Sequence, residues 1–168
     1  MNDLLITAQT ADSPGGSLSA VSTANAHMDI SAVTATTGND RLLYDGGPLD
    51  GLAGVDTIEF RLGENLDFST SPVKPSNIEQ FDLMPVGQNH SLSHLSAQDV
   101  LDMTGTGKSL TILGDSGDSV SLKSTVGGTW SAGVAETVGG HNFDVYLNTQ
   151  DPAIKVLIEH QIVKSIDP

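Results

Sequence analysis

Short runs of alternating apolar and polar residues recur along the chain from residue 55 onward. In residues 55–62 the side chains of Ile58, Phe60 and Leu62 fall on one face, and polar side chains fall on the other. A period of two is that of a β-strand with one buried face. Further short strands are expected at residues 65–68, 77–83, 109–113 and 119–122.

The end of the chain predicts an antiparallel hairpin. Its strands are residues 143–147 and 154–163, and the polar segment 148–152, which ends in a proline, joins them. Trp130, the single tryptophan of the chain, is expected to pack near this hairpin.

One segment, residues 96–103, predicts a helix. Ser96 is its expected N-cap, accepting a hydrogen bond from the amide of Asp99, and the apolar side chains of the segment would face inward. A helix of about two turns must be held by packing rather than by helix propensity. Asp99 and Asp102 are expected to face solvent or to cap.

Together these segments predict an all-β fold with one short helix. Tight glycine turns that lead into short strands are typical of coils stacked in parallel, as in a β-roll or a short β-solenoid. The C-terminal hairpin would be added to such a stack. A two-sheet β-sandwich would produce much the same sequence pattern, so it stays open as the alternative.

The length of 168 residues makes one folded domain the default, with a core of useful size. Residues 2–9 can form one more strand, and residues 10–37 are small and polar, with a linker-like Pro-Gly-Gly-Ser at 14–17. We therefore expect an N-terminal strand and flexible linker over 1–37, where the linker is either engineered or the site of an insertion. The domain itself is expected over 38–168.

Charge and cysteine content narrow the possible functions. The chain has 21 acidic and 7 basic residues and a net charge of −14, so nucleic acid and anionic membrane surfaces are not expected partners. Bound divalent cations would relieve the self-repulsion, although acidity can also simply keep a protein soluble. The absence of cysteine excludes disulfides, thiolate chemistry and Cys-type zinc sites. No apolar run approaches the ~18 residues of a membrane span, and no signal peptide is visible.

The stretch 38–60 carries the strongest candidate chemistry. Glycine, any residue, aspartate, any residue and an aliphatic residue occur in that order twice, around Asp40 and around Asp56. Glycine permits the tight turn, aspartate supplies a hard anionic oxygen, and the aliphatic residue points into a core. This combination predicts a Ca²⁺ site. The predicted ligands are Gly38, Asp40, Asp45, Asp50, Gly54 and Asp56, with carbonyl oxygens of neighbouring glycines.

A second candidate Ca²⁺ site is formed by Asp115 and Asp118, which lie between two expected strands. For both sites the alternative is that the aspartates only form turns, through hydrogen bonds from their side chains to their own backbone. Calcium takes six to eight oxygens, a number that carboxylates, carbonyls and water together can supply here.

Three motifs that imitate other sites are rejected. Residues 114–117 spell the nucleophile segment of trypsin-like proteases, but no histidine stands in a matching context. Residues 105–109 imitate the end of a phosphate-binding loop, but they precede a strand rather than a helix. His90 and His94 could share one face, yet zinc would need further ligands, so both are expected to be surface histidines. No catalytic site can be assembled.

In the same order along residues 38–163, several segments resemble a module of the large RTX adhesins, which carry calcium-binding nonapeptide repeats. The segments are 38–40, 52–58, 66–69, 77–83, 99–103 and 114–122. The chain departs from the family in repeat quality, because the full Gly-Gly-x-Gly-x-Asp sequence never occurs and no tandem run is present.

This resemblance implies a secreted, calcium-stabilised, non-enzymatic domain inside a longer polypeptide. RTX adhesins leave Gram-negative bacteria by type I secretion and act at the cell surface in cell adhesion and biofilm formation. The implied role is to brace or present neighbouring domains of the same chain, with the domain itself a monomer. One alternative is that the domain itself binds a cell-surface glycan or peptide, which a calcium with an open coordination position, or Trp130 or Tyr146 exposed beside one, would favour. A more remote alternative is a calcium-dependent hydrolase or lyase.

Overall fold

The computed structural model describes residues 35–61, 64–72, 74–84 and 88–168. The chain divides into two units, Met1–Ile30 and Ser31–Pro168, and every described residue belongs to the second, which is treated by itself. The strand expected at residues 2–9, the linker up to residue 34 and Leu62 lie outside the described residues.

The described residues form short strands and one α-helix. The strands are β1 Arg41–Leu43, β2 Thr57–Glu59, β3 Asn65–Asp67, β4 Gln80–Asp82, β5 Ser91–Leu95, β6 Ser109–Leu113, β7 Ser119–Lys123, β8 Trp130–Ala132, β9 Glu136–Val138, β10 His141–Asn148, β11 Lys155–Glu159 and β12 Val163–Asp167. The helices are α1 Ala97–Thr104 and the 3₁₀ turn η1 Gly105–Gly107. The all-β prediction is therefore confirmed, although several strands are shorter than expected.

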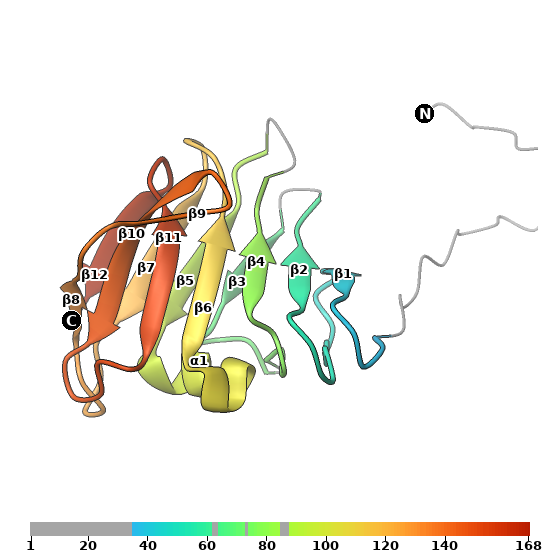
Figure 1. Ribbon diagram of the computed structural model, residues 1–168, viewed down its shortest axis with the longest axis horizontal. Coiled ribbons are helices and arrows are strands. Elements are labelled where there is room, and N and C mark those ends of the chain that lie inside the picture. The colour runs from blue at the N-terminus through green and yellow to red at the C-terminus, as the bar shows by residue number, and fades with distance from the viewer. Residues whose placement is uncertain (1–34, 62–63, 73, 85–87) are drawn as a thin grey trace, which may run out of the picture. The chain divides into compact units, whose positions relative to one another are not determined.

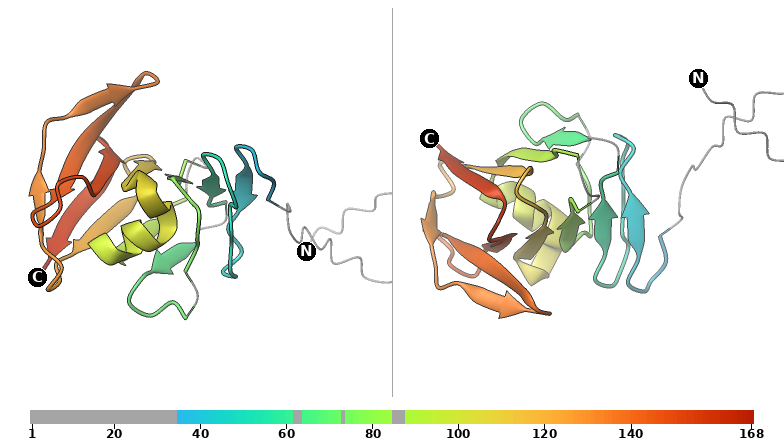
Figure 2. Two further views of the ribbon diagram at one scale, coloured as in Figure 1. Left: turned by 60° about the horizontal axis from the view of Figure 1, so that its bottom comes forward. Right: turned by 90° about the horizontal axis from the view of Figure 1, so that it is seen from above.

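The strands make two sheets that face each other (Figures 1 and 2). One has the order β1-β2-β4-β6-β11-β10-β8, with β9 also paired to β10, and the other has the order β12-β7-β5-β3. From β2 to β7, consecutive strands alternate between the two sheets. Every pairing between named strands is parallel except the three made by β10.

The parallel pairings place like side chains in register across the first sheet. Leu42, Ile58, Phe81, Ile112 and Ile158 occupy one row through five neighbouring strands, and none is more than 1% exposed. Apolar side chains on adjacent strands, about 4.8 Å apart, touch along the whole row. This row is the central line of the core.

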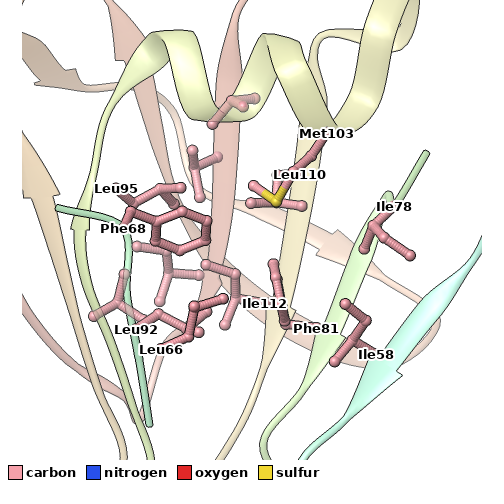
Figure 3. Packing of buried hydrophobic residues seen from close by; sticks show 14 of the residues in the cluster. Ile58, Leu66, Phe68, Ile78, Phe81, Leu92, Leu95, Met103, Leu110 and Ile112 are labelled. Atoms are coloured by element: carbon pink, nitrogen blue, oxygen red, sulfur yellow. The ribbon is translucent and has the colours of Figure 1, made fainter. Parts of the chain in front are cut away.

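The second sheet contributes the opposite wall of the core, and α1 closes one end (Figure 2). Leu66, Leu92 and Val120 form the equivalent row on this side, and each is at most 2% exposed. Figure 3 shows Met103 of α1 reaching down onto Leu110 at the end of the core. Packing of Val100 and Met103 in the core therefore holds a helix too short to be stable alone.

The predicted N-cap of α1 is confirmed. The Ser96 side chain accepts a hydrogen bond from the Asp99 amide, and the Asp99 side chain accepts one from the Ser96 amide, which completes a capping box. Asp99 is buried and also pairs with Lys74, whereas Asp102 is exposed. Of the two roles expected for these aspartates, Asp99 therefore caps and Asp102 faces solvent.

The C-terminal hairpin is also confirmed, with one boundary wrong. β10 and β11 pair antiparallel from Phe143–Glu159 to Leu147–Lys155, and Trp130 in β8 packs beside them with 4% of its surface exposed. The second strand was expected to continue to residue 163, but it stops at Glu159. The chain turns there, and Val163 begins a new strand, β12, in the opposite sheet beside β7.

The expectation that His90 and His94 are surface histidines is wrong for His90. Its side chain is buried beside Phe60, its Nδ1 lies 3.1 Å from the Leu83 carbonyl oxygen, and it packs against Asp118. His94 stays half-exposed, because a β-bulge between Leu92 and Leu95 shifts the alternation at this point. Its φ of 57° lies in the left-handed region. A regular strand would have put both rings on one face.

We predict that Ile112→Ala destabilises the fold by about 2–5 kcal/mol, because it leaves a cavity in the middle of the central row. Val126→Ala is the matched control, since Val126 is fully exposed and its truncation should change stability by less than about 0.5 kcal/mol. Urea unfolding of both variants measures the difference. Equal small effects would contradict the packing described for this row.

Candidate functional site

Three acidic residues occupy the same register position in neighbouring strands. Asp40, Asp56 and Glu79 each stand immediately before a strand, respectively β1, β2 and β4, whose first residues are aligned. The Asp40 amide donates to Asp56 Oδ1 at 2.8 Å, and the Asp56 amide donates to Glu79 Oε2 at 2.9 Å. The side chains of Asp56 and Glu79 thus each hold the backbone at the start of the neighbouring strand in place.

The second carboxylate oxygen of Asp56 is not used in this way. Asp56 is fully buried, and its Oδ2 has no hydrogen-bond partner among the described residues. This oxygen lies against Gly51, where an added Cβ would come within 2.6 Å of it and would also overlap the Asn77 carbonyl oxygen. Two oxygens therefore converge on a position that only glycine leaves open. A buried carboxylate oxygen without a donor is costly unless a cation or a proton meets it.

The charge around this oxygen is negative. Burial raises the pKa of Glu79, and the nearby charge of Asp56 raises the same pKa further, while the hydrogen bond from the Asp56 amide acts in the opposite direction. The burial of Glu79 and the nearby charge of Asp56 therefore disfavour the charged form of Glu79 in the absence of a cation.

Asp118, in the turn 114–118, accepts the amide of a neighbouring strand in the other sheet in the same way. Asp118 precedes β7, is fully buried, and its Oδ1 accepts the amide of His90, which precedes β5, at 2.9 Å. Here, however, Oδ2 accepts the Asp115 amide at 2.8 Å, so both oxygens have donors. Asp115 itself accepts from the Gly117 amide in a local turn. The two predicted sites therefore differ, because only the Asp56 turn leaves a buried oxygen without a donor.

Two other predicted ligands, Asp40 and Asp45, have local partners. The Asp40 carboxylate accepts hydrogen bonds from the amide and hydroxyl of Thr36, and Asp45 accepts one from the Gly47 amide at 2.8 Å. These are the turn-forming contacts that the sequence left open as the alternative to calcium binding.

Asp50 lies nearer to the Asp56 turn and links its parts. It accepts hydrogen bonds from the Leu52 amide at 3.0 Å and from the Asn77 side-chain amide at 2.7 Å, which together lower its pKa. The predicted glycines Gly38 and Gly54 meet through the backbone. A Cβ on Gly54 would overlap the Gly38 carbonyl oxygen, and its φ of 140° also favours glycine.

The structure thus brings part of the predicted Ca²⁺ site together. Among the described residues, no three His, Asp or Glu side chains converge as a metal-binding group, and the candidate donors at the Asp56 turn are instead one carboxylate oxygen, one carbonyl oxygen and the nearby Glu79. Glu79 and Asn77 were not among the ligands predicted from the sequence. For Glu79 a signal was present, because an acidic residue, a polar residue and a core residue occur in that order at 40–42, 56–58 and 79–81.

Comparison of the chain with known protein families, with curated proteins and with solved structures found no match. In the part of the chain that the structure describes, no helix is long and apolar enough to cross a membrane.

We predict that Gly51→Ala destabilises the protein by about 1–3 kcal/mol, because the new methyl group would overlap the Asn77 carbonyl oxygen and press on Asp56. Gly107→Ala is the matched control, because nothing lies within 4 Å of the added Cβ. Thermal unfolding of the two variants measures the difference. A Gly51→Ala variant as stable as the control would contradict the close packing of this turn.

A second prediction concerns pH in the presence of a chelator. Because the pKa of Glu79 is raised above its ordinary 4.5 in the folded protein, the native state keeps this proton to a higher pH than the unfolded state does. Its ionisation therefore lowers stability as pH rises above 4.5. Glu79→Gln should gain stability relative to wild type between acidic and neutral pH.

Urea unfolding at a series of pH values measures this difference, and Asp102→Asn is the control because Asp102 is exposed on α1. Parallel pH profiles for wild type and Glu79→Gln would show that the Glu79 carboxylate is not held against Asp56 in solution.

Proposed function

We propose that residues 38–168 form a non-enzymatic, calcium-stabilised extracellular module of the RTX adhesin type. In this proposal the module is exported by type I secretion from a Gram-negative bacterium and braces or presents neighbouring domains in cell adhesion and biofilm formation. The observation that carries the calcium part is the buried Oδ2 of Asp56 beside Gly51, for which the described residues provide no hydrogen-bond donor. The adhesin part rests on the sequence resemblance along residues 38–163.

We further interpret the two sheets as a short β-roll to which the hairpin β10–β11 is added. Two features favour a roll over a β-sandwich. Successive strands from β2 to β7 change sheet, and partner strands run parallel at matched register. The sheets of a β-sandwich are antiparallel. A stack of this kind is suited to extending or bracing a chain, because each coil contacts mainly its neighbours.

Calcium at the Asp56 turn would act as a clamp. Asp56 and the Asn77 carbonyl would supply oxygens, with Glu79 and water available to complete the six to eight ligands that calcium takes. The ion would offset the repulsion between Asp56 and Glu79 and would tie the loop before β2 to the segment before β4. Trp130 is buried and Tyr146 is partly buried against the core, so neither supports the alternative in which an exposed ring binds a ligand.

We predict that saturating calcium raises the thermal midpoint of the wild-type chain and that a chelator reverses the rise. At about 100 times the dissociation constant, a ligand bound only by the native state adds about 2.7 kcal/mol, which corresponds to a rise of several degrees. Asp56→Asn should remove this rise. In the chelator the same variant should be as stable as wild type or more so, because the asparagine side chain keeps an oxygen for the Asp40 amide and loses the buried charge.

Asp102→Asn removes the same charge from an exposed position and should keep the full calcium effect. Two results would overturn the proposal. One is an unchanged wild-type midpoint in calcium, and the other is an Asp56→Asn variant that responds to calcium like Asp102→Asn.

A further inference from the structure

A small hollow lies where β10 begins and β11 ends, at the open end of the hairpin β10–β11. The hairpin lies on the opposite side of the sheet from β1 and β2 (Figure 1). Its volume is about 240 Å³, and its lining residues are Gly140, His141, Asn142, Glu159, His160 and Gln161. The hairpin between β9 and β10 turns through Gly139 and Gly140, both at positive φ, and their missing side chains leave this side open.

The side chains of the hollow are fixed from behind. His141 Nδ1 lies 2.8 Å from Glu159 Oε1, and Glu159 Oε2 accepts the Gly114 amide at 3.0 Å. Glu159 is buried, and each of its two carboxylate oxygens has a partner within the protein. The pairing orients the His141 ring and leaves its Nε2 without a partner among the described residues.

The side-chain amides of Asn142 and Gln161 each use only one of their two polar groups in a hydrogen bond. Asn142 accepts from the Thr137 hydroxyl at 2.8 Å, and Gln161 donates to the Gly114 carbonyl oxygen at 2.9 Å. Within the described part of the chain, the NH₂ group of Asn142 and the carbonyl oxygen of Gln161 have no hydrogen-bond partner. The hollow therefore offers donors and acceptors together, next to two imidazole rings. The ring of His160 is exposed, and its Nδ1 lies 3.0 Å from Asp144 Oδ1.

The chemistry of the lining excludes most classes of ligand. An anion would face the Glu159 carboxylate on a protein of net charge −14. A metal ion finds no converging group of three ligands among the described residues, and no apolar side chain lines the hollow. A peptide that binds by adding a strand would need a free strand edge, but β10 is paired with β9 on one side and β11 on the other.

A neutral ligand with several hydroxyl groups matches what remains, because each hydroxyl can both donate and accept. We propose that this hollow binds a single neutral sugar residue through His141, Asn142, His160 and Gln161. The inference goes beyond the proposed calcium function and does not depend on it, since none of these side chains contacts the Asp56 turn. Because the hollow is small and open, affinity for one sugar residue is expected at the millimolar level.

The test is a titration of the isotope-labelled full chain, in calcium, with glucose, galactose, mannose, fucose and N-acetylglucosamine, followed by amide chemical shifts. The concentrations must reveal dissociation constants in the millimolar range. At least one sugar should shift the amides of 140–142 and 159–161 in a saturable way. If none does, or if the shifts map elsewhere on the protein, the proposal is overturned.

Two variants give the test a second readout. Asn142→Ala and His160→Ala should each weaken binding of the responding sugar about three- to tenfold, the loss expected for one hydrogen bond. His94→Ala is the control, because His94 is paired with the Asp67 carboxylate as His160 is with Asp144, but it lies in the other sheet. Equal affinities for all three variants, with unchanged thermal midpoints, would overturn the site. If calcium does not change the stability of the wild-type chain but the sugar still changes the amide chemical shifts, only the calcium proposal is overturned.

Discussion

The fold depends on acidic side chains that accept hydrogen bonds from backbone amides of the neighbouring strand. Asp56 accepts the amide of Asp40 in one sheet, and Asp118 accepts the amide of His90 in the other. Both carboxylates are fully buried and stand immediately before a strand, where the chain enters the sheet. Since a slip of one residue would exchange the inner and outer faces of a strand, these contacts fix which side chains reach the core.

Such a device has an electrostatic consequence. A carboxylate that enters the protein brings two oxygens with it, and the backbone amide of the neighbouring strand satisfies only one. At Asp118 a second amide, that of Asp115, completes the set. In the first sheet Val55 separates Gly54 from Asp56, whereas Gly117 directly precedes Asp118. No amide of the described residues reaches Asp56 Oδ2. Where geometry withholds a donor, a bound cation becomes the natural substitute.

The two candidate sites differ in kind as well as in place. The Asp56 turn is buried and anionic, and its carboxylates accept hydrogen bonds from backbone amides, so an ion there would act on stability. The hollow at the β10–β11 hairpin is exposed, and among its side chains His141 is oriented by Glu159 and Gln161 by Gly114. A ligand there could exchange with solvent without disturbing the core. A bracing role and a recognition role could therefore coexist in one domain.

The sequence by itself determined the local structure. Short apolar–polar runs located β2, β3, β4, β6, β7, β10 and β11, although β1, β5, β8, β9 and β12 were not predicted. Ser96 and Asp99 defined the start of the helix, and the Pro-containing turn at 148–152 indicated the hairpin, because these signals act within a few residues. Pairing between residues far apart in the chain was decided only by tertiary structure: Asp56 against Glu79, and His90 beneath Asp118. The bulge at His94 and the turn that ends β11 also escaped the pattern. The physical reason is strand register. The register decides which backbone amides lie beside each aspartate, and therefore which carboxylate oxygen is left without a donor.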